Sequence, residues 1–209
     1  MPLAVTVSSR EVFLDDLRDR LVHGHGFSVA TMNLDHVVKL RSDSAFREAY
    51  AAQSHVTADG RPVVWLNRLA GRPVDLVTGS DLVEPLAHIC AETSVPIAMF
   101  GSPGTVLDAS ANALRERHSQ LVVAFRAAPE MGFDPESREA DSIIERIGAS
   151  GARLCFVALG APKQEIFAAR AGRALPHVGF VSVGAGLDFI AGAQRRAPRL
   201  VRILAAEWL

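Results

Sequence analysis

The sequence predicts an α/β protein with a mostly parallel sheet that is flanked by helices on both faces. Short runs of apolar and β-branched residues alternate along the chain with longer amphipathic stretches, which is the pattern of repeated βαβ units. Two of these runs, 121–125 and 154–159, are apolar throughout, as expected for strands that helices cover on both sides. Glycine-containing turns directly follow several of the runs and are suited to tight strand-to-helix connections.

The composition is that of an ordinary globular protein. The chain has 209 residues, of which 49% are hydrophobic and 22% charged, so it can bury a sizeable core and is not disordered. Its formal net charge of -1 provides no basic field for a nucleic-acid partner. Cys90 and Cys155 lie far apart in the sequence, and we expect reduced, buried thiols rather than a disulfide.

The chain has no segment that resembles a membrane span, since none approaches the run of about 18 apolar residues that a spanning helix needs. Its first residues also lack the charged head and apolar core of a signal peptide. We therefore expect a cytoplasmic protein that can meet a membrane only at its surface.

In the first half of the chain, strands are expected at 5–7, 27–31 and 55–57. Helices are expected from about residue 8 to 22 and at 34–40, 44–52, 62–69 and 81–93. Ser8 with Glu11, and Asp81 with Glu84, have the spacing of capping boxes and predict the starts of the first and last of these helices.

In the second half, strands are expected at 96–100, 121–125, 154–159 and 178–183. Helices are expected at 104–117, after the turn at 160–163, and at 198–209. Asp134 and Pro135 have the order of an N-cap followed by a proline in the first turn, which predicts a further helix start there.

The functional residues are expected in the turns that follow the strands, because ligands of such sheets bind beyond the carboxyl ends of the strands. In this chain those turns are 31–33, 57–60, 101–104, 160–165 and 184–188.

Asp59 is the candidate for acid–base chemistry, because a carboxylate held at a strand end can act as a general base. The alternative is that Asp59 and Gly60 simply form a turn. Thr31 and Asn33 offer short hydrogen-bonding side chains at another strand end, although Asn33 could equally cap the helix that follows.

The turn from Gly101 to Gly104 could hold a diphosphate, because glycine allows close backbone approach and a helix N-terminus offers free N–H groups. It could equally be a plain connection, and it matches neither G-x-G-x-x-G nor a P-loop. Gln164 can donate and accept at once, which suits a sugar hydroxyl or a base edge. Glu165 and Asp188 each lie in a first helical turn, where a carboxylate also stabilises the helix dipole.

The C-terminal residues predict a basic, amphipathic helix that carries Arg195, Arg196, Arg199 and Arg202. Such a helix could contact anionic lipid or a pyrophosphate, or it could pack as a terminal helix with a solvated basic edge. A metal site is not expected, because the histidines are scattered and no D-x-D or H-E-x-x-H motif occurs.

Several of these segments occur together, in this order, in one protein family. They are Thr31-x-Asn33, Ala58-Asp59-Gly60, Val77-Thr78-Gly79-Ser80-Asp81, Gly160-x-Pro162-Lys163-Gln164-Glu165, Gly184-Ala185-Gly186-x-Asp188, Arg196-Ala197-Pro198 and Glu207-Trp208. Across essentially the whole chain, the sequence resembles the WecG/TagA/CpsF glycosyltransferases, also called glycosyltransferase family 26. The resemblance implies a Rossmann-like α/β fold and a single glycosyltransferase domain over residues 1–209.

The resemblance also implies the reaction. Such enzymes transfer a hexose or N-acetylhexosamine-type sugar from a UDP-sugar, with inversion and without a metal or other cofactor. Their acceptor is a sugar linked through diphosphate to a polyprenyl lipid, and their products feed teichoic acid, enterobacterial common antigen, capsule or exopolysaccharide. The protein is therefore expected at the cytoplasmic face of the cell membrane, touching it through the C-terminal region. A homo-oligomer in which a neighbouring chain completes the pocket is compatible with the family.

The resemblance implies a role for each matching residue. Asp59 corresponds to the proposed general base, and Thr31 lines the same pocket as a second catalytic candidate. The expected substrate-binding positions are Asn33, Gly101, Gly104, Gln164, Glu165, Gly184, Asp188 and Arg196.

The sequence departs from the family pattern in several places. Pro62 stands where a second glycine usually follows Asp-Gly-x, and Leu76 stands near the place of a usual arginine, which could alter a charge contact or the donor preference. Family members usually continue beyond Glu207-Trp208 with a basic appendage, whereas this chain ends at Leu209. We therefore expect a domain without that appendage and weak or absent activity in this form.

Two other functions stay open from the sequence. A nucleotide-sugar-binding subunit without catalysis would need the same pocket but not the base, and the Leu76 departure favours it slightly. A nicotinamide-dependent enzyme on the same kind of sheet is disfavoured, because G-x-G-x-x-G is missing.

Overall fold

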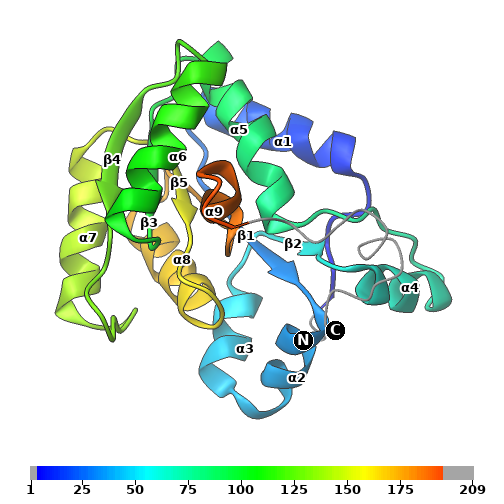
Figure 1. Cartoon of the computed structure of the whole chain (residues 1–209). Coiled ribbons are helices and arrows are strands. Elements are labelled where there is room, and N and C mark those ends of the chain that lie inside the picture. The colour runs from blue at the N-terminus through cyan, green and yellow to red at the C-terminus, as the bar shows by residue number, and fades with distance from the viewer. Residues whose placement is uncertain (1–3, 195–209) are drawn as a thin grey trace.

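The computed structural model describes residues 4–194, which form six strands and nine helices (Figure 1). The strands are β1 (Phe27–Met32), β2 (His55–Ala58), β3 (Ile97–Phe100), β4 (Val123–Ala127), β5 (Leu154–Val157) and β6 (Gly179–Ser182). The helices are α1 (Arg10–His23), α2 (Leu34–Ser42), α3 (Ser44–Ala51), α4 (Arg61–Leu69), α5 (Gly79–Glu92), α6 (Gly104–Arg117), α7 (Arg138–Ala149), α8 (Lys163–Ala174) and α9 (Gly186–Ile190). Arg196 and the helix expected at 198–209 lie outside the described residues.

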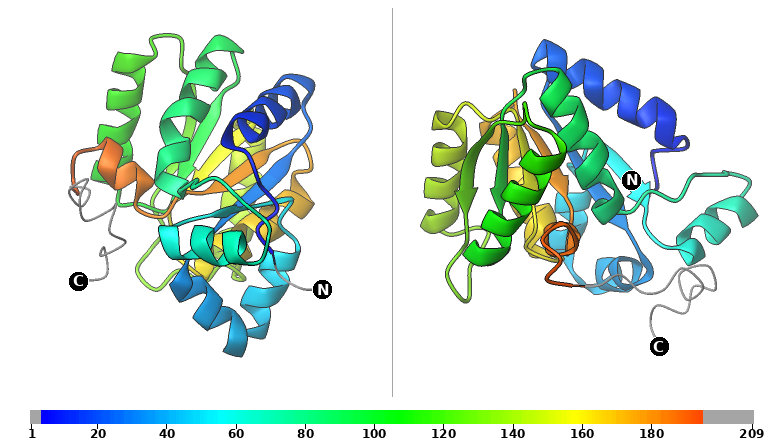
Figure 2. Two further views of the ribbon diagram at one scale, coloured as in Figure 1. Left: turned by 90° about the vertical axis from the view of Figure 1, so that its right-hand side faces the viewer. Right: turned by 45° about the horizontal axis from the view of Figure 1, so that its top comes forward.

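The strands belong to one parallel sheet in the order β2-β1-β6-β5-β3-β4, which confirms the predicted α/β, Rossmann-like fold class. Helices α1, α5, α6 and α9 cover one face, and α2, α3, α7 and α8 cover the other (Figures 1 and 2). All the strands run the same way, so they all end at one edge of the sheet, called here the carboxyl edge. Helix α4 follows the outermost strand β2 and projects beyond it (Figure 1).

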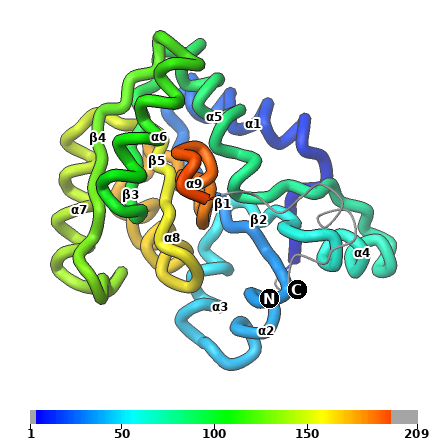
Figure 3. The backbone as a smooth tube through the Cα atoms, viewed as in Figure 1, coloured from blue at the N-terminus to red at the C-terminus, as the bar shows by residue number. Residues whose placement is uncertain are grey.

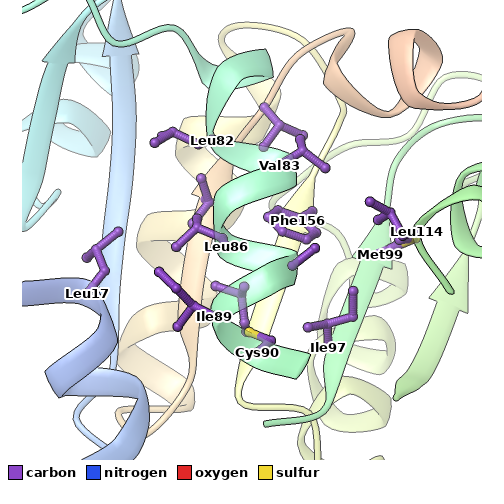
Figure 4. Close-up of a cluster of buried hydrophobic side chains, with 14 of the residues drawn as sticks. Leu17, Leu82, Val83, Leu86, Ile89, Cys90, Ile97, Met99, Leu114 and Phe156 are labelled. Carbon is purple, nitrogen blue, oxygen red and sulfur yellow. The ribbon is translucent and has the colours of Figure 1, made fainter. Parts of the chain in front are cut away.

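The larger core lies under α5, which packs between α1 and α9 (Figure 3). Leu82, Leu86 and Cys90 of this helix join strand residues such as Ile97 and Phe156 in one buried cluster (Figure 4). Cys90 is unpaired, and burial raises the pKa of its thiol to about 12, so it stays a neutral, unreactive core side chain.

β3 and β5 are neighbours in the sheet, yet the chain leaves them in opposite directions. From β3 the chain passes through α6 to β4 on one side, and from β5 it passes through α8 to β6 on the other. In open parallel sheets such a switch leaves a crevice between the two strand ends, and ligands bind there. The turns after β3 and β5 border this crevice.

Two expected features of the N-terminal region differ from the structure. Residues 5–7 do not form a strand, because the N–H groups of Thr6 and Val7 both donate to the carbonyl oxygen of Val56 and no regular ladder can form. Helix α1 is capped by Ser9 rather than by Ser8, since the Ser9 hydroxyl accepts from the N–H of Val12.

Helix α5 begins two residues before the expected start. Thr78, not Asp81, is its N-cap, and the Thr78 hydroxyl accepts from the Asp81 N–H and donates to the Asp81 carboxylate at 2.8 Å. The hydroxyl thus satisfies the Asp81 N–H, and the cap of α5 lies at Thr78 instead of Asp81.

Helix α7 and strand β4 also begin later than expected. Asp134 accepts from the N–H of Glu136 in a turn, and Ser137 then caps α7 at Arg138. Strand β4 begins at Val123 and lies at the edge of the sheet, where it is only partly covered. The apolar run at 121–125 therefore does not mark a strand that is buried on both faces.

The switch point gives a stability prediction for two neighbouring glycines. Gly101 has a φ of +121°, and a Cβ there would lie 2.5 Å from the Ala158 carbonyl, whereas Gly104 has no atom within 4 Å of such a Cβ. We expect Gly101→Ala to lower the free energy of unfolding by about 2 kcal/mol or more, from backbone strain and overlap. Gly104→Ala, the matched control, should leave it unchanged or raise it by up to about 1 kcal/mol. Urea unfolding measures both, and equal effects would contradict the prediction.

Candidate active site

The ends of β1 and β2 bring Thr31, Asn33 and Asp59 together. The two strands are paired up to their last residues, and the Asp59 N–H donates to the Met32 carbonyl at 2.8 Å. Thr31 is buried and Asp59 is half-buried. The Asn33 Oδ1 atom accepts from the N–H of His36 at 2.9 Å, which confirms that Asn33 caps α2.

The only tyrosine of the chain, Tyr50 in α3, is buried beneath these strand ends. Its hydroxyl donates to the Thr31 carbonyl at 2.9 Å and lies 2.6 Å from the His36 Nδ1 atom. Because the hydroxyl proton points to Thr31, the Nδ1 atom must carry a proton and donate to the Tyr50 oxygen. Burial lowers the pKa of His36, so this ring is neutral with its proton on Nδ1.

Tyr50 also connects the two carboxylates of this region electrostatically. Its pKa is raised, first by burial and then by the negative charges of Glu165 and Asp59. Both carboxylates therefore lie close enough to act on the same hydroxyl, although Glu165 comes from α8 and Asp59 follows β2.

Glu165 is a fully buried carboxyl group in the first turn of α8. Its Oε1 atom accepts from the Gln164 Nε2 atom at 2.8 Å, while Oε2 has no hydrogen-bond partner among the described residues. The Gln53 side chain donates from Nε2 to the Glu165 backbone carbonyl at 3.2 Å. Burial raises the pKa of Glu165 to about 7, so the group is close to half-protonated at neutral pH.

Gln164 connects α8 to the turn that follows β6. Its Oε1 atom accepts from the Gly184 N–H at 3.2 Å, and its Nε2 atom is bonded to Glu165. The side chain is buried, and both ends of its amide contact the protein. Gln164 thus connects the turn after β6 to the first turn of α8. Direct binding of a donor sugar by Gln164 stays a prediction.

The turn after β6 also reaches the crevice beside β3. The buried Ser102 hydroxyl donates to the Asp188 Oδ2 atom at 3.3 Å, which joins the turn 101–104 to α9. Gly101 packs against the backbone at the end of β5, while Gly104 faces open space.

Like the short helix α9, helices α4, α6 and α8 begin at the carboxyl edge and have no side chain that caps their N-termini. The residues in the cap positions are Gly60, Pro103 and Pro162, whose side chains offer no acceptor. Some first-turn N–H groups donate to nearby backbone carbonyls, as Val63 does to Gly60 and Gln164 does to Gly160. The remaining first-turn N–H groups can bind water or an anion.

These contacts form a continuous line along the carboxyl edge from Asp59 to Gly101. Strands β2 and β3 are four positions apart in the sheet. At a spacing of about 4.8 Å between neighbouring strands, the two ends of the line lie about 19 Å apart. The edge is therefore long enough for an extended ligand, or for two ligands end to end.

A separate hollow of about 340 Å³ opens between α5, α6 and α9. Its lining residues are Ser80, Asp81, Glu84, Arg117, Phe189, Ile190 and Gln194. The predicted site residues that the structure describes are absent from this lining, so it is not the candidate site.

Residues 4–194 contain neither a cluster of metal-ligating side chains nor a helix that could span a membrane. In this part of the chain, no group of three His, Cys, Asp or Glu side chains is placed to hold a metal ion. Over the same residues, no helix is both long and apolar enough to cross a membrane.

Sequence reasoning missed His36, Tyr50 and Gln53. The spacing of Phe46 and Tyr50 predicts one buried face of α3, and Gln53 follows at the next position of the same spacing, just after the helix; this spacing was the available signal. It does not reveal that the polar ends of this face reach the backbone of β1 and of α8.

The fold and the site define a doubly wound α/β protein whose candidate ligand-binding turns lie at the carboxyl edge of a parallel sheet. A family model described as the Glycosyl transferase WecG/TagA/CpsF family matches residues 1–209, the whole chain. The chain belongs to this family and is a glycosyltransferase, which confirms the resemblance of its motifs.

The contact between Tyr50 and His36 can be tested by a double-mutant cycle. Tyr50→Phe leaves the Thr31 carbonyl and the His36 N–H without partners, so we expect a loss of about 2 kcal/mol in the free energy of unfolding. His36→Leu removes the other partner. Fewer unpaired groups remain in the double variant. Its loss in the free energy of unfolding should therefore be about 1 kcal/mol smaller than the sum of the losses of the two single variants. Strictly additive losses in urea unfolding would show that the two groups do not interact.

The buried Glu165 predicts a pH dependence of stability. Burial raises its pKa to about 7 in the folded protein from 4.5 for a solvent-exposed glutamate, so the folded state holds its proton more tightly than the unfolded state. The contribution is complete below pH 4.5 and is lost as the pH rises to about 7, by about 3 kcal/mol. Glu165→Gln keeps an acceptor for Gln164 and removes the titration. Urea unfolding from pH 5 to 8 should show a smaller decline for this variant, and equal declines would contradict the prediction.

Proposed function

We propose that this glycosyltransferase moves a hexose or N-acetylhexosamine-type sugar from a UDP-sugar to a sugar linked through diphosphate to a polyprenyl lipid. The transfer inverts the anomeric centre and serves the synthesis of a cell-surface polymer, such as teichoic acid or exopolysaccharide. The proposal includes action at the cytoplasmic face of the cell membrane, because the acceptor is held there by its lipid. One observation carries it: the connected turns run from a carboxylate after β2 to uncapped helix N-termini beside β3 and β5.

The β3 and β5 end of this line suits the nucleotide diphosphate. The N-termini of α6 and α8 present N–H groups and positive dipole ends, and the open space at Gly104 allows close approach of a phosphate to the backbone. Asp188 is half-buried beside this turn and can accept hydrogen bonds from ribose or sugar hydroxyls. Helix N-termini can stabilise the negative charge of the departing UDP.

The β2 end suits the acceptor, and Asp59 is the proposed base there. In a single displacement, the acceptor oxygen attacks the anomeric carbon while the bond from that carbon to the UDP oxygen breaks. The bonding electrons leave with UDP, and the proton of the acceptor hydroxyl moves to the Asp59 carboxylate as the new bond forms. Attack opposite to the leaving group inverts the centre, and Thr31 lies beside this reaction with its backbone held by Tyr50.

A binding subunit without catalysis is the second candidate, and the position of Leu76 favours it. Leu76 is bridged to Ala58, directly before Asp59. The family resemblance predicts an arginine near this position. In this chain the residue beside the proposed acceptor end is the uncharged Leu76. A chain that binds UDP-sugars and transfers none, whichever acceptor is offered, would support this candidate.

Replacement of Asp59 tests the proposed base. The donor is first chosen as the UDP-sugar that gives the largest rise in melting temperature, and the acceptor is a short polyprenyl-diphosphate-linked sugar. Asp59→Asn should lower the rate of transfer about a hundredfold and leave UDP affinity unchanged, because the variant keeps the shape and loses the basic oxygen. Asp35 is an exposed carboxylate on α2, and the control variant Asp35→Asn should leave the rate of transfer unchanged. Unchanged turnover in Asp59→Asn would remove this residue as the base.

A further inference from the structure

Helix α4 turns its apolar side toward solvent. Trp65, Leu66 and Leu69 are 48%, 55% and 85% exposed, whereas Val63 of the same helix is 3% exposed. At 100° per residue, these three side chains share one side of the helix, named here the α4 face. Helices of globular proteins normally bury such a side, so the α4 face is suited to contact something other than water.

The surroundings of the α4 face are positively charged. Arg61, Arg68 and Arg72 lie in α4 and the turn after it, and residues 60–74 contain no Asp or Glu. The chain as a whole has a formal net charge of -1, so this segment is a local concentration of positive charge. An apolar helix side with Trp and Leu, bordered by arginines, is the arrangement of helices that lie in a membrane interface.

Helix α2 extends the same kind of surface from the neighbouring strand. Leu34, Val37 and Val38 are all exposed, and Lys39 and Arg41 follow them. Because β1 and β2 are paired side by side up to their ends, α2 and α4 both begin at the same corner of the carboxyl edge (Figure 2).

We propose that the α4 face, with α2 beside it, docks on a membrane surface that contains anionic lipids. The apolar side chains enter the boundary between headgroups and acyl chains, and the arginines meet the negative headgroups. This charge complementarity is the reason for choosing anionic lipid as the partner. The α4 face belongs to the folded domain and is distinct from the C-terminal region that the sequence predicts to touch the membrane.

Docking by the α4 face has a consequence that rests on the proposed function. Asp59 stands two residues before α4, so seating this helix at the interface brings the Asp59 turn next to the headgroup layer. A sugar linked through diphosphate to a membrane lipid would be presented at that depth. The α4 face would then position the enzyme over its acceptor.

Vesicle flotation of the full chain tests the proposal without donor or acceptor. The wild-type chain should float with vesicles of phosphatidylcholine and phosphatidylglycerol, bind pure phosphatidylcholine less, and lose affinity as salt is raised. The variant Trp65→Ser/Leu69→Ser should bind the anionic vesicles at least about tenfold more weakly. The matched control Val122→Ser/Met131→Ser changes exposed apolar residues away from α4 and should bind as the wild type does. Arg68→Gln/Arg72→Gln should reduce the preference for anionic vesicles.

Three results would overturn the proposal: no binding by the wild type, equal binding by the α4 variant, or self-association of the wild type that the α4 variant abolishes. The last result, read by light scattering, would make the α4 face a contact between copies of this chain. Circular dichroism checks that the variants are folded, as expected for exposed positions. Transfer to a detergent-soluble acceptor should be the same in the α4 variant and the wild type, so failure of docking and failure of the proposed glycosyl transfer are separate outcomes.

Discussion

Parallel strand pairing is the constraint on which the rest of the molecule depends. Since every strand ends at the same edge, the turns that carry Asn33, Asp59, Gly101, Glu165 and Asp188 become neighbours although they are spread over most of the chain. The same geometry directs the N-termini of α4, α6 and α8 to that edge, because each of these helices starts where a strand stops. Polar side chains and helix N-termini without side-chain caps are thus concentrated along one line, while apolar cores cover both faces of the sheet.

The carboxyl edge is held together by buried polar contacts that cross between distant segments. Tyr50 bonds to the end of β1, and Gln53, just beyond the end of α3, bonds to Glu165 at the start of α8. Such contacts are costly when incomplete, and Glu165 Oε2 and Gln53 Oε1 have no hydrogen-bond partner among the described residues.

The edge divides into ends with different chemistry. Near β3 and β5 it offers backbone N–H groups and small residues, which suit phosphate oxygens. Near β2 it offers a carboxylate and, directly beyond it, a helix whose apolar and cationic residues face outward. In the proposed reaction, a donor that extends from the first end would meet a lipid-linked acceptor near the second end, beside Thr31 and Asp59. This arrangement agrees with a membership in a glycosyltransferase family that covers the whole chain.

The sequence by itself determined the alternation of strands and helices, the parallel sheet and the turns at which polar residues gather, because these follow from local apolar periodicity and from glycine and proline positions. It erred where a neighbouring hydroxyl changed a helix start, as Thr78 and Ser137 did, and where an apolar run became the edge strand β4. Only the tertiary structure decided that Tyr50 holds Thr31, that Glu165 is buried with a raised pKa, and that α4 faces outward. Local pattern cannot specify these features, because burial and hydrogen-bond partners arise from segments that meet only when the sheet is assembled.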